Sequence, residues 1–160
     1  MDTFACPKIR FQYLIPNSAD EKFGCTVSTV GSQIIDPDDD YPSKDHPPGY
    51  MFDPARGRIL QEYQLLYIVR GKGVFSNDSG SYEINKGTII LLRPGKWHTY
   101  KPLKGAGWSE YFIGFSGELA ARSIAMLFPE DRQVFDAGLN RELGDLYQRA
   151  VEVAATDRPA

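Results

Sequence analysis

The chain has few of the side chains that bind metals or form cross-links, with only two cysteines and two histidines among its 160 residues. Cys6 and Cys25 are too few and too oddly placed for a disulfide framework, and free thiols are usual in a reducing cytoplasm. A metal site in a β-barrel needs about three nitrogen or carboxylate ligands from neighbouring strands. His46 lies in a proline-rich segment, and no histidine stands just before the apolar run that begins at Leu65. We therefore expect no metal and no other cofactor.

Long apolar runs and clustered positive charge are also missing. No apolar run approaches the roughly 20 residues that span a bilayer, and the N-terminus lacks the basic start and apolar core of a signal peptide. Lysine and arginine are scattered, and the formal net charge is −3, so the chain offers no basic surface to a phosphate backbone. Hydrophobic residues make up 42% of the chain, which is enough for the core of one domain. We expect a cytoplasmic domain that contacts neither a membrane nor, by itself, DNA.

Three apolar or alternating runs predict strands between Tyr63 and Phe115. Leu65–Val69 and Thr88–Leu92 are apolar on both faces and need cover on both sides, whereas residues 108–115 alternate aromatic with polar side chains. Glycine and proline follow the first two runs, so we expect turns at Arg70–Gly73 and at Pro94-Gly95. No segment of helical length separates these strands. The pattern predicts a mainly β fold, a small antiparallel double sheet or jelly roll.

Elsewhere the patterns predict one more strand, a loop and two helices. Residues 25–31 alternate with period two, and residues 36–50 are rich in aspartate and proline. A first helix is expected after a Ser116 cap and before Pro129, and a second after an Asn140 cap. The second helix is amphipathic, so it packs on its own sheet, or it instead or also pairs with a second copy. Its candidate dimerisation residues are Leu143, Leu146, Tyr147, Ala150 and Val151.

The run from Trp108 to Phe115 places a carboxylate between two aromatic side chains. Trp108, Glu110 and Phe112 share one face of the strand by alternation. An unpaired buried carboxylate is costly, so Glu110 either faces solvent or lies in a wet pocket where a ligand hydroxyl or a cation satisfies it. Aromatic walls beside carboxylate and guanidinium groups suit a small polar ligand such as a sugar. His98 is either a hydrogen-bonding residue near such a pocket or a satisfied core histidine.

Three stretches resemble the N-terminal cupin domain of AraC-family transcriptional regulators. They are residues 63–73, residues 86–100 and residues 108–117, which include a Gly-x-Gly pair, the Pro-Gly-x-x-His motif and the ending Trp-x-x-Tyr-Phe-Ile-x-Phe-Ser-Gly. The resemblance implies a cupin-like double-stranded β-helix or jelly-roll barrel over residues 1–117, followed by two C-terminal α-helices in a dimerisation region over residues 118–160. It also implies that an N-terminal arm, Phe4–Pro16, folds over a ligand.

The resemblance further implies a sensor that binds a small effector, often a sugar, and acts as a homodimer. In members that respond to arabinose, an arginine and a tyrosine on the sugar align with Arg56 and Tyr100. Glu110 and Phe112 replace a histidine and a tryptophan there, which argues against arabinose itself. The expected ligand-binding residues are Arg56, His98, Tyr100, Trp108, Glu110 and Phe112.

The family's DNA-binding half, two helix-turn-helix units, is not found in these 160 residues, so we expect this chain to be the sensor part of a longer protein. Two rival hypotheses remain. One is a stand-alone cupin enzyme, a metal-dependent sugar isomerase or dioxygenase. The other is a structural dimerisation module whose barrel is filled by its own side chains. No serine, threonine or cysteine has an evident base partner, so the sequence does not favour nucleophilic catalysis.

Overall fold

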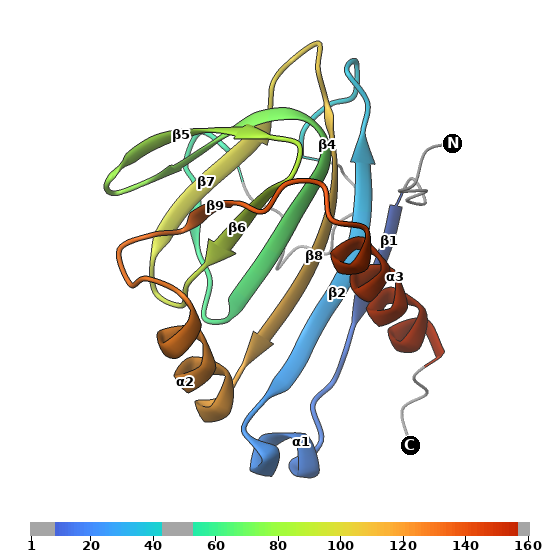
Figure 1. The fold of residues 1–160 in the computed structure, drawn as a ribbon, viewed down its shortest axis with the longest axis vertical. Helices are drawn as coiled ribbons and strands as arrows, with labels where there is room; N and C mark the ends of the chain where they lie inside the picture. Colours follow the sequence, from blue (N-terminus) through green and yellow to red (C-terminus); the bar gives the residue numbers. More distant parts are fainter. Residues whose placement is uncertain (1–8, 43–52, 157–160) are drawn as a thin grey trace.

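The computed structural model describes residues 9–42 and 53–156, with side chains from residue 10 onward. These residues form a β-barrel with helices outside it (Figure 1). The strands are β1 (Ile9–Tyr13), β2 (Thr26–Ile35), β3 (Arg58–Ile59), β4 (Tyr63–Asn77), β5 (Gly80–Asn85), β6 (Thr88–Leu92), β7 (Trp97–Pro102), β8 (Trp108–Ser116) and β9 (Val134–Asp136). The helices are α1 (Ser18–Phe23), α2 (Glu118–Leu127) and α3 (Arg141–Thr156). The predicted mainly β fold with two C-terminal helices is confirmed.

Strand β4 belongs to both halves of the barrel. Its first part pairs with β6 and β8, and its last part, from Lys72 onward, pairs with β5 and β7, all antiparallel. The turn predicted at Arg70–Gly73 is therefore wrong. A bulge lies between Ile68 and Arg70, and Gly71 has a φ of +86°. A Cβ atom at Gly71 would lie 2.1 Å from the carbonyl oxygen of Gly107, so glycine lets the strand bend there and continue.

The barrel interior contains the largest apolar core. Strand alternation sends every second side chain inward, and aliphatic residues from β2, β4, β5 and β6 meet aromatic residues from β4, β7 and β8 there. The buried members of this core are Ile35, Leu66, Ile68, Phe75, Ile84, Ile90, Leu92, Tyr100, Trp108 and Phe112.

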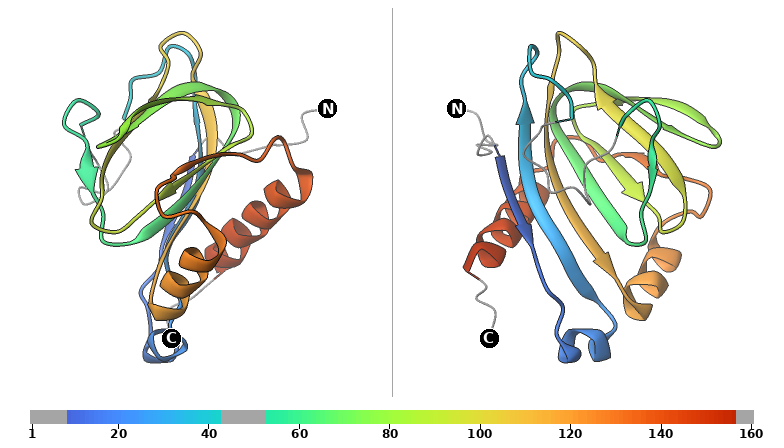
Figure 2. Two further views of the ribbon diagram at one scale, coloured as in Figure 1. Left: turned by 60° about the vertical axis from the view of Figure 1, so that its left-hand side comes forward. Right: turned by 180° about the vertical axis from the view of Figure 1, so that it is seen from behind.

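Helix α3 packs on the outer face of the sheet, beside β1, β2 and β8 (Figure 2). The ring of Tyr147 stacks on Tyr67 and Tyr111 with centroid distances of 6.1 and 5.7 Å. Its hydroxyl donates a hydrogen bond to the carbonyl oxygen of Leu65 at 2.9 Å, and burial raises its pKa well above the ordinary value. Val151 packs on Val30 further along the helix. The prediction that this helix packs on its own sheet is confirmed.

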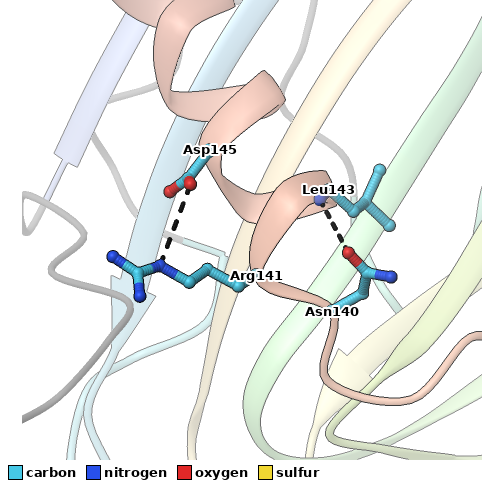
Figure 3. Close-up of polar contacts among 4 residues, drawn as sticks. All are labelled: Asn140, Arg141, Leu143 and Asp145. Carbon is cyan, nitrogen blue, oxygen red and sulfur yellow. Dashed lines mark hydrogen bonds and ion pairs between the residues drawn. The ribbon is translucent and has the colours of Figure 1, made fainter.

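The start of α3 is fixed as predicted. The side-chain oxygen of Asn140 accepts a hydrogen bond from the backbone N–H of Leu143 at 3.0 Å (Figure 3). In the first turn, Nε of Arg141 lies 4.0 Å from a carboxylate oxygen of Asp145, four residues later. The cap satisfies a backbone donor that the first turn of a helix leaves unpaired. The exposed ion pair between Arg141 and Asp145 adds little.

Other expectations are corrected in detail. Ser116 is the last residue of β8 and does not cap α2, which begins after Gly117 at a φ of +119°. Residues 134–136 form β9 on the edge of β6, so the C-terminal region contributes a strand to the barrel. Of the predicted arm, residues 9–13 form an edge strand on β2, and residues 4–8 lie outside the described residues. None of the helices in the described ranges is long and apolar enough to cross a membrane.

Replacing Tyr147 tests the packing of α3. We expect Tyr147→Ala to lower the free energy of unfolding by about 3–5 kcal/mol, because it removes a buried aromatic side chain. Tyr147→Phe should cost only about 1 kcal/mol, the net value of one hydrogen bond. Urea denaturation measures both. Leu127→Ala on α2 is the control, since Leu127 is 74% exposed and the substitution removes a side chain that is not packed in the core. A Tyr147→Ala variant as stable as that control would contradict this packing.

Candidate ligand-binding site

The short strand β3 places the side chain of Arg58 where it donates hydrogen bonds to two side chains of β7. Arg58 stands opposite His98 in the antiparallel register. Its Nε donates to Nε2 of His98 at 3.2 Å, and its terminal nitrogen donates to the hydroxyl of Tyr100 at 2.9 Å. The guanidinium carbon also lies 5.7 Å from the centroid of the Tyr100 ring, which adds a cation–π contact. The guanidinium is therefore held in one orientation.

These contacts also determine the protonation of His98. Because Nε2 accepts from Arg58, the proton lies on Nδ1, which faces the carbonyl oxygen of Lys96 at 3.4 Å. Burial and the nearby positive charge of Arg58 lower the pKa of His98 to about 4. His98 is thus neutral at physiological pH, and the nitrogen that would ligate a metal is already engaged. Among the described residues, no three His, Cys, Asp or Glu side chains form a metal-binding group.

Glu110 lies inside the barrel, with only 4% of its surface exposed. It stands on β8 opposite Gln33 of β2 and Ile68 of β4, so all three share the inner face. Burial raises the pKa of Glu110 to about 8, while the positive charge of Arg58 and the indole of Trp108 act in the opposite direction. The carboxyl group is therefore largely neutral near pH 7.

Two buried polar atoms at this place lack partners. Oε2 of Glu110 and Nε1 of Trp108 make no hydrogen bond with the rest of the described chain. The indole lies near enough to lower the pKa of Glu110, but not in hydrogen-bonding geometry. An unsatisfied buried donor or acceptor costs about 1–3 kcal/mol. Such a pair needs an explanation, and a bound polar molecule is one.

Aromatic rings form the walls around these polar groups. The ring of Tyr100 lies 5.9 Å from Trp108 and 6.0 Å from His98, centroid to centroid. The indole of Trp108 lies directly over Gly73, where a Cβ atom would be 2.4 Å from the indole ring. Glycine at this position of β4 thus makes room for the tryptophan.

Phe112 forms a second aromatic wall, and again a glycine makes room for the ring. Its ring lies 5.4 Å from that of Phe11 on β1. A Cβ atom on Gly31 would lie within 3 Å of both rings, so the glycine of β2 leaves space for them. This side of the barrel therefore combines phenyl, indole and phenol rings with a carboxyl and a guanidinium group, and small-molecule sites commonly combine aromatic walls with a few polar groups in this way.

Tyr41 also contacts the aromatic side chains of this site, and the sequence analysis did not predict it. It follows β2 in the acidic segment, where its ring meets Trp108 edge to face at 6.4 Å. Its hydroxyl donates a hydrogen bond to Tyr100, and burial raises the pKa of Tyr41 well above its ordinary value. Burial likewise raises the pKa of Tyr100 to about 12. The aspartates around Tyr41 gave the segment the pattern of a solvated loop, which concealed it.

The structure brings five of the six expected residues together and separates one. His98, Tyr100, Trp108, Glu110 and Phe112 are buried in the barrel. Arg56 is exposed in the turn before β3, where its carbonyl oxygen accepts a hydrogen bond from the indole of Trp97 at 2.9 Å. Arg58, two residues later, is half-buried and supplies the guanidinium beside His98 and Tyr100 instead.

Comparison with known proteins identifies the kind of domain. Residues 41–159 match the family described as AraC-like ligand binding domain. Over 60 residues the chain is 32% identical to the lactose operon transcription activator of Staphylococcus xylosus, a match that covers 38% of this chain and 22% of that protein. The chain thus spans under a quarter of this regulator.

Several solved structures resemble this chain at low sequence identity. YhaK from Escherichia coli superposes with a TM-score of 0.51 at 12% identity, over 82% of this chain and 51% of that one. The cupin domain of Schizosaccharomyces pombe Cnp3 gives a TM-score of 0.41 at 9% identity over 79% and 77% of the two chains. ToxT from Vibrio cholerae gives 0.41 at 17% over 60% and 41%. The predicted cupin-like fold and family resemblance are confirmed.

The two perturbed groups of the site act on stability in different pH windows. The folded pKa of Glu110 is raised from 4.5 to about 8, so its contribution is full below pH 4.5 and is lost as the pH rises through 8. The folded pKa of His98 is lowered from 6.5 to about 4, so its contribution is lost as the pH falls from 6.5. The two effects oppose each other between pH 4.5 and 6.5.

We therefore expect Glu110→Gln to change the pH dependence of stability between pH 4.5 and 8, because the contribution of His98 is common to both proteins and cancels in the comparison. The wild-type free energy of unfolding should fall relative to the variant by at most about 1.4 kcal/mol per pH unit. Denaturation with urea at several pH values measures this difference. Parallel curves for the two proteins across that window would show that Glu110 titrates normally.

Proposed function

The chain belongs to the AraC-like ligand-binding domain family, and on that premise we propose that it is the sensor part of a cytoplasmic transcription regulator. It binds a small effector, a mono- or oligosaccharide, inside the barrel. The effector controls DNA binding by another domain of a longer protein, and the chain itself catalyses no reaction. Such control requires that the effector bind one arrangement of the regulator better than another.

The observation that carries this proposal is the buried polar group among aromatic rings. Arg58 and Glu110 are the ionisable groups suited to vicinal hydroxyls, and Trp108 and Phe112 offer apolar faces to a sugar ring. We assign the arginine of the site to Arg58 in place of Arg56, because Arg58 donates to His98 and Tyr100. The relative named for a lactose operon supports a sugar. The rival metal enzyme would need His98, whose Nε2 accepts from Arg58.

A thermal-shift screen of mono- and disaccharides, lactose included, tests the effector class. A sugar at 1,000 times its dissociation constant should stabilise the domain by about 4 kcal/mol. Arg58→Ala should abolish the shift, because the guanidinium holds the polar side of the site. Arg56→Ala should leave it unchanged and is the matched control, since Arg56 is exposed. If no sugar raises the melting temperature at millimolar concentration, the sugar assignment is wrong.

We also propose that the domain forms a homodimer through the region 118–160, with α3 at the interface. Of the five candidate residues, Tyr147 and Val151 are buried against the sheet, and Leu143 and Ala150 pack partly on it. Leu146 remains 61% exposed. Val153, seven residues later on α3, is 68% exposed. These two side chains define a stripe on the helix with the spacing of a coiled-coil heptad.

The double variant Leu146→Glu with Val153→Glu tests the stripe. It should convert a dimer to a monomer at micromolar concentration without unfolding the domain, because both side chains project from the sheet. Sedimentation equilibrium gives the mass, and circular dichroism gives the fold. Met126→Glu on α2 is the control, since Met126 is 86% exposed and lies away from the stripe. A wild-type monomer, or a dimer that survives the double substitution, would contradict this interface.

A further inference from the structure

Two of the buried polar atoms that have no hydrogen-bond partner among the described residues belong to side chains on the inner face of β8. Oε2 of Glu110 is an acceptor when the carboxyl group is ionised, and Nε1–H of Trp108 is a donor only. Both residues are buried, at 4% and 1% exposed surface, and within the described chain neither atom has a hydrogen-bond partner. They project from β8 on its inner face, two residues apart, so one small group can reach both.

The chemistry of these atoms selects among ligand groups. An ammonium group only donates and would leave the indole N–H unpaired. A carboxylate or phosphate only accepts and would be repelled by an ionised Glu110. A hydroxyl group both donates and accepts, so it satisfies the two atoms at once.

We propose that Glu110 and Trp108 together recognise one hydroxyl group of the effector, which donates to the Glu110 carboxylate and accepts from the Trp108 indole. This assignment rests on the proposed function, that the barrel interior holds the effector. It makes Glu110 and Trp108 the residues that discriminate a hydroxyl from an amine or an acid at that position.

A consequence is that effector binding releases a proton. The carboxyl group of Glu110 is largely neutral near pH 7, because burial raises its pKa to about 8. A donated hydrogen bond favours the ionised form, so the hydroxyl displaces the proton.

The charged and titratable groups around Glu110 leave it as the group that changes charge near neutral pH. Arg58 from β3 remains positive. His98 on β7 is neutral above about pH 4, and the raised pKa values of Tyr100 and Tyr41 keep both phenols neutral. Gln33 opposite it on β2 carries no charge.

Small probes test this without knowledge of the effector. Ethylene glycol, ethylammonium and acetate represent a hydroxyl, a donor and an acceptor, and each is titrated into ¹⁵N-labelled protein. The chain has two tryptophans, so its two indole N–H signals are assigned with Trp108→Phe. Trp97 is the internal reference, because its indole already donates to Arg56.

We expect ethylene glycol to shift the Trp108 indole signal saturably and to leave the Trp97 signal in place. Its affinity should rise about tenfold per pH unit below pH 8 and level off above it. In Glu110→Gln this pH dependence should vanish while the shift remains. The ¹³C signal of the Glu110 carboxyl group in the unsubstituted protein, titrated with and without glycol, gives the same answer: glycol should lower its pKa.

Other outcomes overturn the assignment. A Trp108 shift caused by acetate and strongest at low pH would mean that a neutral Glu110 donates to an acceptor ligand. A shift caused by ethylammonium would mean a cation site. Silence with all three probes would mean that nothing enters beside these atoms. A sugar that stabilises the protein while the Trp108 signal stays fixed would leave the proposed function standing and remove only this inference.

Discussion

The structure depends on a constraint inside its barrel: a carboxyl group must be accommodated in an apolar interior beside a half-buried guanidinium. Moving a full charge out of water costs several kcal/mol unless hydrogen bonds and an opposite charge offset it. Arg58 meets this with two hydrogen bonds to β7, and Glu110 meets it by holding a proton, as its raised pKa shows. The interior is thus stable but leaves polar atoms of Glu110 and Trp108 without a hydrogen-bond partner among the described residues, and a ligand can supply one.

The course of β4 brings the polar groups together. β8 carries Glu110 on one half of the barrel, whereas β7 carries His98 and Tyr100 on the other, and β4 pairs with both strands. The bend at Gly71 makes this dual pairing sterically acceptable. A reversal of the chain at that point, as the glycines suggested, would have produced two separate hairpins with no shared interior.

The sequence allowed the β8 side of the site to be predicted and obscured the β3 side. Alternation over nine residues is a long enough signal to place Trp108, Glu110 and Phe112 on one face, and burial of the apolar strands follows from their composition. β3 has only two residues. A strand this short has no alternating pattern from which to infer which side chain faces the interior. In Arg56-Gly57-Arg58 either arginine fits a polar site, and only the long-range register of Arg58 with His98 decides between them. Tyr41 depends likewise on contacts from distant strands.

Strand β8 also links the interior to the outer helix. Its inner face carries Glu110, and the next residue, Tyr111, stacks on Tyr147 of α3 from the outer face. The strand is paired along its length with both β2 and β4, so a displacement on one face involves the other. An effector that interacts with β8 differently in two arrangements of α3 would therefore shift their populations, whereas one that binds both equally would shift nothing. Regulation thus requires that the effector make different hydrogen bonds with the interior groups of β8 in two arrangements of α3, which differ in how Tyr147 packs on the sheet.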